Sequence, residues 1–139
     1  MFLLDTNVVS ELRKLPPGRA NPGLVAWATS VSSAVMFISA ITLHELELGV
    51  KLAERSDPAK GAILRTWLDA TVVPAFSQRI LAVDEVVAVR SAALHVPDPA
   101  PYRYAFIGAT ALIHGMTVVT RNTADFLRFP DAKVLNPWT

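Results

Sequence analysis

An α/β sandwich with a central, mostly parallel sheet is the fold class that this sequence predicts, and 139 residues suit a single domain. Short apolar runs alternate along the chain with stretches whose apolar residues recur at helical spacing, which is typical of strand–helix–strand units. The composition, 52% hydrophobic and 18% charged, is that of a globular domain. We therefore expect one folded domain over residues 1–139, without repeats or long linkers.

The predicted strands are short apolar runs bounded by polar or turn-forming residues. They cover residues 1–5, 35–39, 79–83, 116–120 and 132–136. The first of them, MFLLD, ends in a carboxylate, as a buried parallel strand with an acid at its carboxyl end would.

The predicted helices cover residues 6–14, 24–33, 40–56, 57–76, 84–94 and 104–115. The longest amphipathic pattern lies in residues 40–56, where Leu43, Leu46 and Val50 share one face. An Asp-Pro pair starts the next helix, Asp84 is suited to cap the fifth, and Gly115 is suited to end the last. Residues 15–23, rich in Pro and Gly, are predicted to form a loop, and residues 121–126 a turn.

The composition and the N-terminus exclude several classes of protein. The absence of cysteine excludes disulfides and thiolate metal sites. No apolar run reaches 18 residues, and the N-terminal run meets an acid at position 5, so we expect neither a membrane span nor a signal peptide and predict a cytoplasmic protein. A net charge of +1 neither requires nor excludes an RNA partner.

Three acids follow predicted strands, at the edge of a parallel sheet where ligands bind. Asp5 closes the first strand, Glu45 lies in the first turns after the second, and Asp125 lies in the turn after residues 116–120. Each also has a purely structural interpretation: Asp5 as a helix cap, Glu45 in a capping box with Thr42, and Asp125 as the brace of a surface turn.

Convergence of these acids would require a cation, because two carboxylates about 4 Å apart repel by about 4 kcal/mol at an effective dielectric constant of 20. Oxygen ligands without cysteine favour Mg²⁺ or Mn²⁺ over zinc. Phosphate-binding glycine motifs are absent from the sequence. A receiver-like domain phosphorylated on Asp5 would need an acidic pair just before that residue and a late-strand lysine, and neither is visible.

Four blocks of sequence carry a family resemblance: MFLLDTNVVSEL, ISAITLHELELGV, AFIGATALIHGMTVVTRNTADF and VLNPW. In this order they resemble the PIN-domain toxins of bacterial type II toxin–antitoxin pairs, the VapC and FitB group. The resemblance implies a PIN-like α/β/α fold and a Mg²⁺- or Mn²⁺-dependent endoribonuclease acting on structured RNA, often tRNA or rRNA. It also implies a homodimer held inactive by a VapB-like antitoxin.

The same resemblance assigns roles to particular residues. It implies that the catalytic and metal-binding acids are Asp5, Glu45 and Asp125. The polar groups expected to support or orient them are Thr6, Asn7, Thr120 and Asn122.

One position departs from the family pattern, which reads Asp-x-x-Ile-Ala-Ala-Thr-Ala where this chain has Tyr104-Ala-Phe-Ile-Gly-Ala-Thr-Ala. Tyrosine is bulkier than aspartate and neutral near pH 7, since its ordinary pKa is about 10. We therefore expect nuclease activity to be weak or absent. The alternative function is an inactive PIN module that binds a cognate antitoxin. Tyr102 and Arg103 are further candidates, as a platform on which RNA bases stack.

Overall fold

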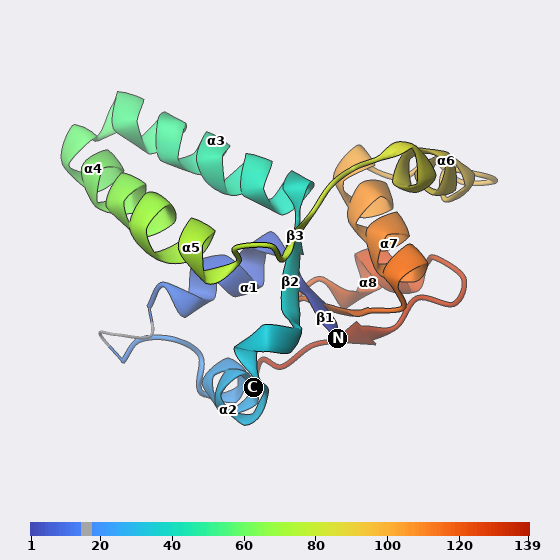
Figure 1. Cartoon of the computed structure of the whole chain (residues 1–139), viewed down its shortest axis with the longest axis horizontal. Coiled ribbons are helices and arrows are strands. Elements are labelled where there is room, and N and C mark those ends of the chain that lie inside the picture. Colours follow the sequence, from blue (N-terminus) through green and yellow to red (C-terminus); the bar gives the residue numbers. More distant parts are fainter. Residues whose placement is uncertain (15–17) are drawn as a thin grey trace.

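The structure is a computed structural model that describes residues 1–14 and 18–139. Its centre is a parallel sheet with the strand order β3-β2-β1-β4-β5 (Figure 1). The strands are β1 (Phe2–Leu4), β2 (Met36–Ser39), β3 (Ile80–Leu81), β4 (Thr117–Val119) and β5 (Val134–Leu135). β1 lies in the middle, where Leu3 is in register with Phe37 of β2 and Val118 of β4. The α/β fold with a parallel central sheet is therefore confirmed.

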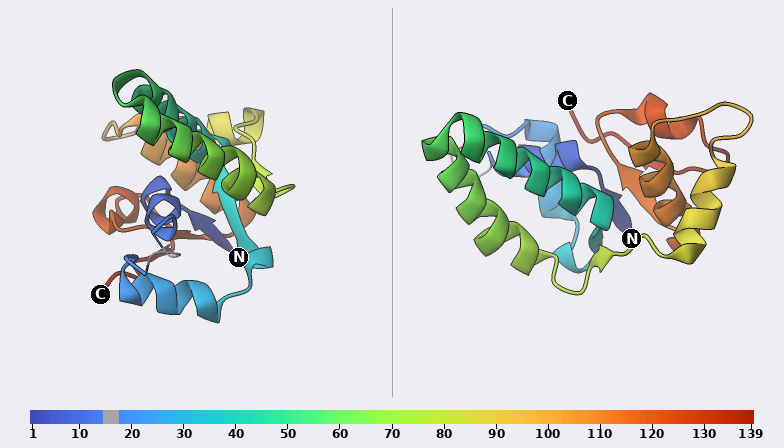
Figure 2. Two further views of the ribbon diagram at one scale, coloured as in Figure 1. Left: turned by 90° about the vertical axis from the view of Figure 1, so that its left-hand side faces the viewer. Right: turned by 90° about the horizontal axis from the view of Figure 1, so that it is seen from above.

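Helices connect the strands and cover both faces of the sheet (Figure 2). In chain order they are α1 (Thr6–Leu12), α2 (Pro22–Ser30), η1 (Ser33–Val35), α3 (Ala40–Ser56), α4 (Pro58–Trp67), η2 (Leu68–Val72), α5 (Val73–Ala75), α6 (Glu85–Ala93), α7 (Tyr102–His114) and α8 (Thr123–Leu127). None of the helices within the described residues is both long and apolar enough to span a membrane.

Besides shifts of a few residues at several element ends, four features differ from the sequence prediction. Part of the predicted loop, residues 15–17, lies outside the described residues, and its end is helical because Asn21 caps α2 by accepting from the amides of Gly23 and Leu24. The predicted helix over 57–76 is interrupted by η2, a π-helical segment just before Pro74, a residue that cannot donate an α-helical hydrogen bond.

The other two differences lie near the carboxyl edge of the sheet. The predicted turn over 121–126 is wrong, because α8 forms there; five residues are too few to show a helical period. α7 begins at Tyr102, two residues earlier than predicted, directly after Pro101. The early start places Arg103 in the first turn of α7.

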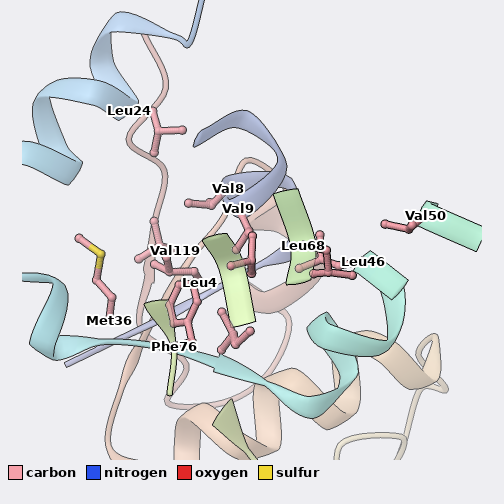
Figure 3. Packing of buried hydrophobic residues seen from close by; sticks show 12 residues of the cluster. Leu4, Val8, Val9, Leu24, Met36, Leu46, Val50, Leu68, Phe76 and Val119 are labelled. Carbon is pink, nitrogen blue, oxygen red and sulfur yellow. The ribbon is translucent and has the colours of Figure 1, made fainter. Parts of the chain in front are cut away.

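Two hydrophobic cores lie on opposite faces of the sheet, because successive side chains of a strand point to opposite sides. Leu4 and Val119 belong to the core beneath α1, α2, α3 and η2 (Figure 3). Ile38 is a member of the same core. Leu3 belongs to the other core, where Ile107 of α7 and Phe126 of α8 are fully buried. In Figure 1 the α3–α4 pair and the α6–α7 pair accordingly extend to opposite sides of the strands. Both cores meet at β1.

The packing of α3 on α4 depends on one glycine. A Cβ atom at Gly61 would lie 2.4 Å from Glu54 Cα and 2.6 Å from Glu54 N, both backbone atoms that cannot rotate away. At Gly49, in the exposed middle of α3, a Cβ atom would meet nothing within 4 Å.

These two glycines form a matched pair for testing the helix packing. We predict that Gly61→Ala lowers the free energy of unfolding by about 1–3 kcal/mol, because the helices must separate. Gly49→Ala should raise it by up to about 1 kcal/mol through helix propensity alone. Urea denaturation measures both values, and equal effects of the two substitutions would contradict this close helix contact.

Candidate functional site

The site lies where the chain direction across the sheet reverses, at the carboxyl ends of the neighbouring strands β1 and β4. After β1 the chain proceeds to β2 on one side, and β4 lies on the other, so the following loops separate there and leave space for a ligand. Asp5 follows β1 directly, and Thr120 follows β4 directly. Both residues are fully buried.

Asp5 is held at both of its carboxylate oxygens. As predicted by one interpretation, it caps α1: Oδ1 accepts from the amide of Thr6 at 2.8 Å. The same oxygen accepts from Nη2 of Arg103 at 2.8 Å, and Oδ2 accepts from the hydroxyl of Thr120 at 2.8 Å. Asp5 can therefore cap α1 and take part in the site at the same time.

Glu45 points into the site from α3. The predicted capping box with Thr42 is wrong: Ser39 caps α3 by accepting from the amide of Ile41, while the buried hydroxyl of Thr42 has no hydrogen-bond partner within the described chain. Glu45 Oε1 instead accepts from the hydroxyl of Thr6 at 2.6 Å. Its carboxylate is thereby turned toward Asp5.

Arg103 joins the two acids. Its Nε donates to Glu45 Oε2 at 2.6 Å, and its Nη2 donates to both Glu45 Oε1 and Asp5 Oδ1 at 2.8 Å. Sequence reasoning considered this arginine only as a stacking platform and missed it as a partner of the acids. The available signal was its place beside the missing acid, at the start of a helix.

The charges of this group stabilise one another. Burial opposes ionisation of Glu45, but hydrogen bonds from Arg103 and Thr6 outweigh it, so the pKa of Glu45 lies below its ordinary value. Burial likewise opposes the charge of Arg103, and its contacts with Glu45 and Asp5 outweigh that effect and raise the pKa of Arg103. The ionised forms of Glu45 and Arg103 are thus favoured in the folded state.

Tyr104 lies beside this ion pair. Its ring packs edge-on against Phe126 with the centroids 5.2 Å apart, and the guanidinium carbon of Arg103 lies 4.5 Å from the tyrosine centroid. Burial raises the pKa of Tyr104; Arg103 acts in the opposite direction, and Asp125 raises it further. Asp125 thus lies near Tyr104, on the short helix α8.

The remaining predicted residues form a polar layer around Asp5. The Thr120 hydroxyl accepts from the amide of Asn122 at 2.9 Å and lies 3.4 Å from Nδ2 of Asn7. The side-chain oxygen of Asn7 accepts from the amide of Arg121 at 3.3 Å. This layer fixes the orientation of the Asp5 carboxylate, and the roles of these residues in catalysis stay predictions.

The fit of a divalent cation can be judged from the oxygens. Both oxygens of Asp5 and both of Glu45 already accept hydrogen bonds. Tyr104 stands where the family pattern quoted above has an aspartate. Among residues 1–14 and 18–139, no three His, Cys, Asp or Glu side chains are placed to hold a metal ion. In this arrangement the residues do not fit a resident Mg²⁺ or Mn²⁺, and the joint role of Asp5, Glu45 and Asp125 as ligands stays a prediction.

Comparisons with known proteins place this chain in a family. The PIN domain family matches residues 2–132, and the chain therefore belongs to that family. It is 39% identical to Toxin FitB of Neisseria gonorrhoeae over 99% of each chain. It is 34% identical to VapC ribonuclease Y4jK of Sinorhizobium fredii over 99% of this chain and 98% of the relative.

Solved structures agree with these sequence relatives. The crystal structure of FitAcB from Neisseria gonorrhoeae contains a chain that superimposes with a TM-score of 0.88 at 37% identity, covering 99% of both chains. A toxin–antitoxin complex from Klebsiella pneumoniae matches with a TM-score of 0.67 at 27% identity, covering 99% of this chain and 98% of that one. Within the PIN family, the chain is thus similar to FitB and VapC toxins along its whole length.

The buried hydroxyl of Thr120 provides a test of the polar layer. We predict that Thr120→Val, which keeps the side-chain shape, lowers the free energy of unfolding by about 1–3 kcal/mol. Asp5 Oδ2 would lose its donor at 2.8 Å in a buried place and keep only the amide of the Asn7 side chain at 3.5 Å. Thr66→Val is the control, since its hydroxyl donates to a carbonyl on the exposed face of α4; its effect should stay within about 0.5 kcal/mol. Equal losses in urea denaturation would contradict a specific role for Thr120.

Proposed function

We propose that this chain is the toxin of a toxin–antitoxin pair. It is related to ribonucleases, and its own RNA cleavage is weak or absent. The observation that carries the proposal is the whole-chain similarity to FitB and VapC proteins. It is combined with an acidic pair at the sheet edge that is bound by Arg103, whose guanidinium lies over Tyr104. Structured RNA, such as tRNA or rRNA, is the proposed substrate class.

The contacts of the acids explain why cleavage would be slow. Glu45 has a lowered pKa and donors on both oxygens, so it is a weak proton acceptor for water. Asp5 is fully buried and saturated by its own donors. Tyr104 adds a neutral ring where the family pattern has a carboxylate. Mg²⁺ or Mn²⁺ is the proposed ion only for a form of the site in which these contacts have changed.

The proposed partners are a VapB-like antitoxin and a second copy of this chain, in the cytoplasm. Support comes from the toxin–antitoxin complex of Klebsiella pneumoniae and from apolar side chains on the outer faces of α3 and α4. Leu48 and Leu52 of α3 and Ile63 of α4 are respectively 47%, 59% and 66% exposed on two helices that pack together, and apolar side chains exposed on neighbouring helices support a partner surface there.

A second candidate function is that of a PIN module that holds the antitoxin and cuts nothing. Arg103 already donates hydrogen bonds to both Asp5 and Glu45, so the site is stable without a bound substrate. This ion pair therefore favours the binding module. Its functional part would be the exposed helical surface instead of the acids.

RNA cleavage in the presence of Mg²⁺ distinguishes these candidates. We predict that Tyr104→Asp cleaves RNA at least about tenfold faster than the unchanged chain, because it returns a carboxylate to the first turns of α7. Tyr104→Phe is the matched control: it keeps the ring that packs against Phe126 and Arg103 and adds no carboxylate, so it should leave the rate unchanged.

Two outcomes would redirect the proposal. Robust cleavage by the unchanged chain, equal to that of Tyr104→Asp, would show that Tyr104 does not impair the site. No cleavage by any variant, together with co-purification of a small antitoxin, would favour the binding module over the ribonuclease.

A further inference from the structure

The group formed by Asp5, Glu45 and Arg103 places one guanidinium between two carboxylates, where a metal site would have its cation. Two carboxylates share one guanidinium nitrogen, Nη2, which donates to Asp5 Oδ1 and Glu45 Oε1 at equal distances of 2.8 Å. We propose that Arg103 is the built-in cation of this site, and that a divalent cation binds Asp5 and Glu45 only when the guanidinium has left them. The proposal relies on the proposed function only for identifying the acids as the functional site.

The contact between Arg103 and Glu45 has the geometry of a specific pair. Nε and Nη2 meet the two oxygens of one carboxylate, which is the side-on, two-pronged arrangement that only a planar guanidinium provides. A surface ion pair between long, mobile side chains would gain little by comparison. Here Asp5 is fully buried, and the side chains of Arg103 and Glu45 are each only 26% exposed.

The position of Arg103 is set from the core. Phe126 is fully buried, its ring meets Tyr104 edge-on, and the face of Tyr104 lies beneath the guanidinium of Arg103. A cation over an aromatic ring gains further electrostatic stabilisation. Tyr104 therefore has a second effect besides removing an acid: it holds the arginine against the remaining two.

The proposal requires the guanidinium of Arg103 to rotate outward. Arg103 lies in the first turn of α7 and keeps part of its side chain in contact with solvent, which is the side toward which it would move. Until it does, every oxygen of the two carboxylates has a donor. A divalent cation must therefore compete with Arg103 for the same oxygens.

Calorimetric titration with Mn²⁺, in the absence of RNA, tests this competition. We predict that Arg103→Met binds Mn²⁺ at least about tenfold more tightly than the unchanged chain, because the acids lose their counter-charge. Adding Asp5→Asn to Arg103→Met should abolish the gained binding. Arg90→Met, which removes an exposed arginine of α6, is the charge-matched control and should bind Mn²⁺ as the unchanged chain does.

Thermal melting of the same proteins supplies a second readout. Arg103→Met should melt at a lower temperature in EDTA and recover when Mn²⁺ is added, whereas the unchanged chain should respond little to either. If Arg103→Met does not fold, Arg103→Gln, which keeps donors but no charge, is judged by the same criteria. Equal Mn²⁺ affinity in the unchanged chain and in a folded Arg103 variant would overturn the proposal.

The measurement of Mn²⁺ binding tests the role of Arg103 independently of RNA cleavage. If Arg103→Met gains Mn²⁺ binding while Tyr104→Asp does not cleave RNA, the built-in cation stands and the ribonuclease proposal fails. If Tyr104→Asp cleaves RNA while Arg103→Met binds Mn²⁺ no better than the unchanged chain, the reverse holds.

Discussion

The structure depends on how two carboxylates are kept together at the carboxyl edge of a parallel sheet. Asp5 is fully buried and Glu45 is partly buried, so their carboxylates would repel each other, and such a pair needs a cation and several donors to persist. In this chain the cation is Arg103, and the donors come from Thr6 and Thr120. Asp5 and Thr120 follow β1 and β4 directly, and the other members of the group lie in α1, α3 and α7.

The two cores explain how those elements reach one point. Consecutive leucines of β1 are buried on opposite faces, so β1 is fixed from both sides and its carboxyl end cannot shift. The core beneath α3 fixes the helix that carries Glu45, and the core beneath α7 and α8 fixes Tyr104 through Phe126. The site is thus assembled from rigid elements, which suits a precise ion pair.

The sequence predicted that Asp5 and Glu45 converge at one edge of the sheet but not that Arg103 is their counter-ion. The difference has a physical reason. Asp5 and Glu45 follow strands, and parallel strands place their carboxyl ends at one edge, so their convergence follows from topology. Arg103 is 98 residues from Asp5 and 58 from Glu45, and no local pattern reports such a contact. The sequence prediction also began α7 two residues too late, so residues 102 and 103 were expected outside the helix. For this reason too, the contact of Arg103 with the acids was not expected. Tyr104 was recognised only because a family pattern showed what it replaces.

The guanidinium of Arg103 can be observed directly by nuclear magnetic resonance, through its Nε–Hε signal assigned by its loss in Arg103→Lys. If Arg103 is the cation of the site, this proton is hydrogen-bonded to Glu45 and exchanges slowly with water. The signal should keep its position when Mg²⁺ is added to millimolar concentration. A rapidly exchanging proton, or a signal that Mg²⁺ shifts to that of a free arginine, would contradict the account.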